Sequence, residues 1–207
     1  MSRKKKILLV SPDMERYSQP RMGILYIGTA LIRTGQEVKI ITINERKIDL
    51  LRNTLLNFKP DWVGATAFSS QHVFVMDIFK VTKEINPGTF TVFGGPHASA
   101  LPEYLLKNNI YIDFIIKGEG EESIVELVSN NKKYSEISGL VYRDGNKIIV
   151  NGSEIISDLE SLGYPFLIAD KYEYRKSKVH GYMCKHKPVV PVFRPVDVRI
   201  CVHTVQK

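Results

Sequence analysis

Small and polar residues that could bind a ligand fall into four short segments of this sequence. Each segment follows a run of apolar residues, and the four are Ser11-Pro12-Asp13, Phe68-Ser69-Ser70, Gly94-Gly95-Pro96-His97 and Gly118-Glu119-Gly120-Glu121. Glycine allows a ligand to approach the backbone closely and exposes N–H groups, and serine hydroxyls both donate and accept hydrogen bonds. These residue types therefore suit the binding of a bulky polar ligand.

The elements that must position these segments alternate in type over the first 130 residues. Apolar runs predict five strands, at residues 6–11, 37–43, 62–68, 89–95 and 111–118. Helical apolar spacing predicts five helices, at residues 22–35, 47–58, 71–85, 101–108 and 121–130. Five successive strand–helix units predict an α/β fold, a flavodoxin-like (Rossmann-like) doubly wound five-stranded parallel sheet. The four segments then meet at the carboxyl edge of that sheet, where such folds bind their ligands.

A plainer interpretation is that the glycines and serines only make tight turns between strands and helices. That interpretation suffices for any one loop, but small residues at three loops of the same edge favour a ligand. The first strand is not followed by G-x-G-x-x-G, and the chain has no G-x-x-x-x-G-K-[ST]. A dinucleotide site or a P-loop triphosphate site is therefore not predicted.

Composition narrows the class of protein further. The net charge of +7 is spread along the chain apart from basic clusters at residues 3–6 and 175–187, and the chain has no aromatic-interleaved basic stripe that would suggest a nucleic-acid partner. Apolar runs are too short to span a membrane. The two cysteines, Cys184 and Cys201, cannot build a disulfide framework, so we expect a cytoplasmic protein.

Residues after 135 carry different signals. Two alternating runs flank Asp144-Gly145-Asn146 and predict a β-hairpin, because Asp-Gly tolerates the positive φ of a tight turn. We therefore divide the chain into an α/β domain at 1–135, a hairpin extension at 136–153, a linker at 154–193 and a tail at 194–207.

The ordered segments resemble the N-terminal cobalamin (vitamin B12)-binding domain of B12-dependent radical SAM enzymes. The similar pieces are PRMGILYIGTALIRTGQEVKII, DWVGATAFSS, KEINPG, TVFGGPHAS, LPEYLL, DFIIKGEGEES and ISGLVYRDG, and ISDLESLGYPF resembles the linker before the catalytic barrel. FGGPHAS followed by GEGEES is the specific part. The resemblance covers roughly residues 5 to 170 and implies a corrinoid over the carboxyl edge of the sheet, with its nucleotide tail inserted between strands.

The resemblance also implies roles for particular residues. Ser69 and Ser70 match the hydroxyls that contact the tail, Gly94 and Gly95 line the tail, and further residues border the corrin or its amides. The complete set of expected cobalamin-binding residues is Ser11, Pro12, Phe68, Ser69, Ser70, Gly94, Gly95, Pro96, His97, Gly118, Glu119 and Gly120.

One departure concerns the cobalt ligand. The chain has no D-x-H-x-x-G, so no motif histidine can ligate cobalt from below, as is common in the radical SAM branch. His97 as a cobalt ligand is a minor hypothesis beside a packing or amide-contacting role. Glu119 and Glu121 are more simply explained by the start of a helix than by catalysis. Cys184 and His186 are too few to define a metal site.

The C-terminal sequence breaks the resemblance. HKPVVPVF at 186–193 is similar to the family's lead-in, but the family's C-x3-C-x2-C triad does not follow. The resemblance implies that this triad holds a [4Fe–4S] cluster, which binds and cleaves S-adenosylmethionine. Val198, Val202 and Val205 have the spacing of that triad. Each valine codon begins with GT, and the codon before each of these valines can end in T. A shifted reading frame can therefore read TGT, a cysteine codon, at all three positions. We therefore predict a one-base loss near Arg194 and an out-of-frame tail, which the coding sequence would test, although a genuine extension is the plainer alternative.

Taken together, the sequence predicts the cobalamin-binding domain of a methyltransferase-type B12-dependent radical SAM protein. The resemblance implies a radical SAM domain in cis, and without the cluster ligands we expect no turnover by this chain alone. The alternatives are a stand-alone corrinoid carrier, against which the absent histidine motif counts, and a flavodoxin-like nucleotide-binding enzyme without corrinoid. From about residue 175 onward we expect little order.

Overall fold

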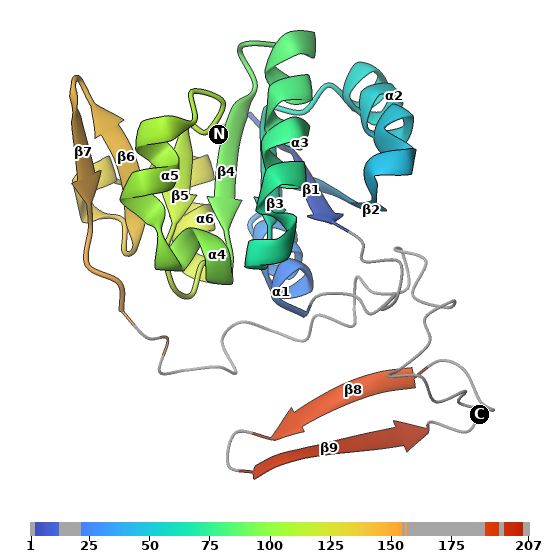
Figure 1. Cartoon of the computed structure of the whole chain (residues 1–207). Helices are drawn as coiled ribbons and strands as arrows, with labels where there is room; N and C mark the ends of the chain where they lie inside the picture. The colour runs from blue at the N-terminus through green and yellow to red at the C-terminus, as the bar shows by residue number, and fades with distance from the viewer. Residues whose placement is uncertain (1–2, 13–21, 155, 157–188, 195–196, 205–207) are drawn as a thin grey trace.

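The computed structural model describes residues 3–12, 22–154, 156, 189–194 and 197–204. Its main body is a seven-stranded sheet in the order β2-β1-β3-β4-β5-β6-β7 (Figure 1). The strands are β1 (Lys6–Pro12), β2 (Glu37–Ile43), β3 (Trp62–Thr66), β4 (Phe90–Gly94), β5 (Phe114–Ile116), β6 (Leu140–Asp144) and β7 (Lys147–Val150). β1 to β5 are parallel, in the flavodoxin-like order 2-1-3-4-5, which confirms the predicted fold.

The alternation of side chains along each strand divides the core into two halves. Ile7 and Leu9 of β1 pack on one face of the sheet, and Leu8 and Val10 pack on the other. The first face is covered by α1 (Met22–Arg33) and α6 (Glu121–Ser129). The second face is covered by α2 (Ile48–Phe58), α3 (His72–Ile85) and α5 (Pro102–Asn108). Both faces are buried, which explains why the strands are nearly continuous apolar runs.

The predicted hairpin is β6 and β7, and it is part of the same sheet. β6 pairs antiparallel with β5, and β7 pairs antiparallel with β6 around a turn at Gly145, whose φ is +57°. The guanidinium of Arg143 donates to the backbone carbonyls of Leu106, Asn109 and Ile112. The hairpin is thereby tied to the end of α5 as well as to the sheet edge.

Element bounds differ from the predicted ones mainly around the third and fourth loops. Four short helices in the described residues were not predicted: the helix α4 (Pro96–Ala100) and three 3-10 turns, of which the first two are η1 (Glu45–Lys47) and η2 (Ser69–Gln71). α4 begins at Pro96 because proline has the φ of a first helical residue and lacks an N–H that would need a partner. A third 3-10 turn, η3 (Tyr134–Glu136), precedes β6.

The C-terminal segment has regular structure where it is described. β8 (Val189–Arg194) and β9 (Asp197–Thr204) form an antiparallel pair with an irregular register between Val192 and Arg194. The expectation of little order from residue 175 is therefore wrong for these two ranges, because valine-rich segments have a high β propensity. Residues 175–188 lie outside the described part of the chain.

Candidate functional site

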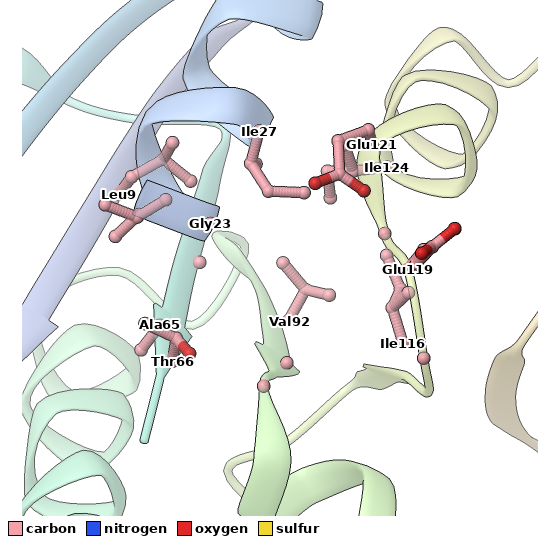
Figure 2. A pocket seen from close by; sticks show the side chains of 16 residues that line it. Leu9, Gly23, Ile27, Ala65, Thr66, Val92, Ile116, Glu119, Glu121 and Ile124 are labelled. Carbon is pink, nitrogen blue, oxygen red and sulfur yellow. The ribbon is translucent and has the colours of Figure 1, made fainter. Parts of the chain in front are cut away.

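A cavity of about 250 Å³ lies at the carboxyl edge of the parallel sheet, between α1 and α6 (Figure 2). Its walls are apolar side chains from the sheet and both helices, and its rim consists of glycines. The lining residues are Leu9, Gly23, Ile24, Ile27, Gly64, Ala65, Thr66, Val92, Gly94, Gly95, Ile116, Gly118, Glu119, Gly120, Glu121 and Ile124. An apolar cavity with a few polar groups is the usual form of a small-molecule site.

The glycines in this cavity create its space. A Cβ on Gly94 would meet only the carbonyl oxygen of Ile116, at 3.8 Å, and a Cβ on Gly23 would meet nothing within 4 Å. Side chains at either position would project into open space rather than into packed protein. Gly64, within β3, has a different role, since a Cβ there would lie 2.9 Å from the Leu9 side chain. Because glycine has no Cβ, the side chains of neighbouring residues can pack closely against the sheet at this position.

The backbone at Gly95 explains why the turn after β4 needs glycine. Its φ is +88°, which residues with a Cβ rarely adopt, and a Cβ would lie 2.2 Å from Thr66 Oγ1. The turn after β5 is similar, because Gly118 has a φ of +78° and its N–H donates to Ser99 Oγ at 3.0 Å. Both turns are therefore fixed by the fold, and both open onto the cavity.

The sequence-predicted residues separate into two groups. Five of them line the cavity: Gly94, Gly95, Gly118, Glu119 and Gly120. The other seven do not: Ser11, Pro12, Phe68, Ser69, Ser70, Pro96 and His97. Ser11 is 4% exposed, whereas the side chains of Ser69, Ser70 and Phe68 are exposed at the same edge of the sheet.

Part of the second group forms a hydrogen-bonded cluster at the ends of β1, β3 and β4. Nδ1 of His97 lies 3.0 Å from Ser69 Oγ, and Nδ1 of His72 lies 2.7 Å from the Ser69 carbonyl oxygen. The two imidazole rings are 4.5 Å apart between centroids. Gln71 Nε2 donates to the carbonyl of Pro12 at 3.2 Å, which ties η2 to the end of β1.

His97 is a buried member of this cluster, with 7% of its surface exposed. Burial lowers the pKa of its imidazole, and the neighbouring His72 lowers that pKa further. Because Nδ1 of His97 is engaged with Ser69 and the residue does not line the cavity, the geometry favours a packing role over ligation of cobalt. In the described part of the chain no three histidine, cysteine or acidic side chains are close enough to hold a metal ion. Cys184 and His186 lie outside that part.

The two glutamates of the Gly-Glu-Gly-Glu segment point in different directions. Figure 2 shows the Glu121 carboxylate turned toward Ile27 of α1, and the Glu119 carboxylate turned away from the cavity. Glu119 accepts a hydrogen bond from the backbone N–H of Ile156, and so fastens the chain that follows β7. Burial raises the pKa of Glu121, the backbone N–H groups of Glu121 and Gly120 oppose the rise, and Glu119 and Glu122 add to it.

Most of the apolar lining was not identified from the sequence. Gly23, Ile24 and Ile27 lie on α1, and their helical spacing predicts only a buried face. Thr66 and Val92 lie inside strands, where apolar and β-branched residues are expected in any case. Gly64 is the exception, since a glycine within a buried strand is a known signal of close approach.

No helix in the described ranges has the length and apolarity that crossing a membrane would require.

Comparisons with known proteins agree with this geometry. The family model described as "B12 binding domain" matches residues 16–128, more than half of the chain. An uncharacterized methyltransferase of Pyrococcus horikoshii is 30% identical over 184 residues, which is 81% of this chain and 40% of that protein. The anaerobic magnesium-protoporphyrin IX monomethyl ester cyclase of Rubrivivax gelatinosus is 29% identical over 169 residues, 75% of this chain and 30% of that protein.

A solved structure shows the same fold. It is the radical S-adenosylmethionine methyltransferase TsrM from Kitasatospora setae, determined with cobalamin and a [4Fe-4S] cluster bound. The TM-score is 0.63 at 21% identity, over 75% of this chain and 30% of that one. The chain thus spans well under half the length of these relatives. The doubly wound sheet and the family match lead to one conclusion: this chain belongs to the B12 binding domain family.

Proposed function

We propose that this chain binds cobalamin, with the nucleotide tail in the cavity between α1 and α6 and the corrin ring over the carboxyl edge of the sheet. The observation that best supports this proposal is the cavity itself, which has a volume of about 250 Å³ and is lined by apolar side chains and glycines. A dry cavity of about 150 Å³ can hold benzene in another protein, so this one has room for a bicyclic aromatic base.

The residues present fit this ligand. Gly94 and Gly23 leave space that a side chain would fill, and the isoleucines of α1, β5 and α6 offer flat apolar contacts to an aromatic ring. Gly95 and Gly118, at the rim, would lie against the tail or the corrin amides. Ser69, Ser70, Phe68 and Pro96 are exposed at the same edge, where the corrin would lie.

The electrostatics disfavour the alternative of a nucleotide di- or triphosphate. None of the described residues that line the cavity is lysine or arginine, and two of them are glutamates. A phosphate-rich ligand would meet like charge and no cation. The stand-alone carrier is disfavoured by the sequence, which has no D-x-H-x-x-G motif.

In the wider context we propose that the bound corrinoid takes part in methyl transfer together with a radical SAM domain. The support is the set of relatives, several of which are named as methyltransferases. That activity would need a [4Fe–4S] cluster and S-adenosylmethionine, and among the described residues no three histidine, cysteine or acidic side chains are placed to hold a metal ion. The chain's two cysteines support a reducing, cytoplasmic location.

Equilibrium dialysis of the purified chain against hydroxocobalamin tests the proposal. We expect saturable uptake, read from the visible corrin absorbance, near one corrinoid per chain. Gly94→Val should weaken binding by about tenfold or more, because its side chain enters the cavity and overpacking typically costs about 1–3 kcal/mol. Gly94 has no positive φ, so this variant should fold.

Gly152→Val is the matched control. A Cβ on Gly152 would meet nothing within 4 Å, and the residue does not line the cavity. It should bind as the unchanged chain does. Absence of saturable uptake by the unchanged chain would refute cobalamin binding, and equal binding by Gly94→Val would refute the placement of the tail.

A further inference from the structure

Glu121 carries an unsatisfied polar atom beside the cavity. Its Oε2 is buried and has no hydrogen-bond partner among the described residues. Only one other buried side-chain oxygen there shares this state, Asn44 Oδ1, and Asn44 does not line the cavity. A buried oxygen without a partner costs free energy, so native proteins usually satisfy such groups with protein, water or ligand.

The direction of the side chain points to a ligand as the missing partner. Figure 2 shows the Glu121 carboxylate between α6 and Ile27, among the labelled apolar residues of the cavity. Glu119 differs, because its carboxylate turns outward and is already bonded to the N–H of Ile156. Of the two acidic residues lining the cavity, Glu121 is therefore the one available to a ligand inside it.

The protonation state of Glu121 decides which ligand atom it suits. Burial is the main cause that raises the pKa of this carboxyl; hydrogen bonds from the backbone N–H groups of Glu121 and Gly120 oppose the rise, and the negative charges of Glu119 and Glu122 add to it. A carboxyl group that keeps its proton is a hydrogen-bond donor as well as an acceptor. An aromatic base with an unprotonated ring nitrogen offers the complementary acceptor within an otherwise apolar ring.

Resting on the proposed function, we infer that Glu121 selects the base of the cobalamin tail through a hydrogen bond between its unpartnered carboxyl oxygen and the free ring nitrogen of the benzimidazole, with a single proton held between the two atoms. The apolar walls made by Ile27, Ile116 and Ile124 would hold the ring faces. Glu121 would then set specificity for nitrogenous bases over bases that lack a ring nitrogen.

Binding of three corrinoids to the full chain tests this inference. The probes are cobalamin, a cobamide whose lower base is p-cresol and therefore has no ring nitrogen, and cobinamide, which has no nucleotide. At pH 7 the unchanged chain should prefer cobalamin over the cresol cobamide by about threefold to tenfold, the usual effect of one hydrogen bond. Cobinamide should bind more weakly than either.

Variants isolate the role of Glu121. Glu121→Leu should bind cobalamin and the cresol cobamide equally, whereas Glu121→Gln should keep the preference, since its amide N–H also donates. Glu103→Gln, which removes an exposed carboxylate on α5 outside the cavity, is the charge-matched control and should behave as the unchanged chain. Circular dichroism of each variant confirms folding.

A pH series adds a second readout. The preference of the unchanged chain should decline as the pH rises, because the hydrogen bond needs one proton between the carboxyl oxygen and the ring nitrogen, whereas the preference of Glu121→Gln should not change. Failure of all three corrinoids to bind would refute the proposed function. Binding without any preference, or a preference that survives in Glu121→Leu, would overturn the role of Glu121 and leave cobalamin binding standing.

Discussion

At the scale of single residues, the glycines of this site have two different physical roles that look alike in the sequence. Gly95 is required by its backbone, since its φ is +88° and a Cβ would collide with Thr66. Gly94, its neighbour, has room for a side chain and provides volume to the cavity instead. Substitution at Gly95 should therefore affect folding, whereas substitution at Gly94 should affect binding.

The histidine cluster makes stability depend on pH. The folded state lowers the pKa of His97 below its ordinary value, so the unfolded chain binds a proton at a higher pH than the folded chain does. The stabilising contribution is complete above about pH 6.5 and is lost as the pH falls through the lower folded value. We expect His97→Gln to flatten the decline of unfolding free energy between pH 7 and pH 5.

Urea denaturation at each pH measures this effect. His72→Gln is the informative comparison, because it removes the second cause of the shift and leaves the first, burial. We expect His72→Gln to flatten only part of the decline of the unfolding free energy between pH 7 and pH 5. A His97→Gln profile parallel to that of the unchanged chain would contradict the assignment.

At the scale of elements, the edge of the sheet opposite the site is held by a polar cluster around Asp113. Its Oδ2 accepts from Lys83 Nζ at 2.6 Å and from the backbone N–H of Thr91 at 2.7 Å. Lys83 also donates to the Thr89 carbonyl at 2.8 Å. The cluster joins the end of α3, the start of β4 and the segment before β5, and so fixes the strands whose opposite ends form the site.

Removal of this carboxylate should destabilise the fold without affecting the ligand. We expect Asp113→Ala to lower the free energy of unfolding by about 2–3 kcal/mol, since a charged hydrogen-bond acceptor is lost and Lys83 is left partly buried. Glu84→Ala removes a carboxylate from the exposed Arg52–Glu84 pair and should cost less than about 1 kcal/mol. Urea denaturation of both variants measures the difference. If both variants lost the same free energy of unfolding, the cluster around Asp113 would stabilise the fold no more than the exposed ion pair does.

At the scale of the whole molecule, β8 and β9 stand apart from the seven-stranded sheet. In the described ranges they pair with each other and with no strand of that sheet. A single two-stranded hairpin is only marginally stable in water, so it should add little to the stability of the α/β body.

A chain that ends at residue 188 tests this separation. Its main thermal transition should lie within about 2 °C of that of the full chain, because no described hydrogen bond to the body is lost. Its uptake of hydroxocobalamin should be unchanged. A fall of more than about 4 °C, which corresponds to about 1–2 kcal/mol at this size, would show that the segment supports the body. The predicted frame change near Arg194 stays a prediction that the coding sequence can decide.

The sequence by itself determined the layers, the parallel sheet, the hairpin and the edge of the sheet at which the cavity lies. These features follow from local periodicity and from turn residues such as Gly95 and Gly118, which a linear pattern displays. Tertiary structure alone decided which edge residues share a cavity. Ser69 and His97 meet on the face covered by α3, whereas Gly94 and Gly120 line the cavity between α1 and α6 on the other face. The packing around that cavity also buries one carboxyl oxygen of Glu121, which the residue's place at a helix start does not reveal.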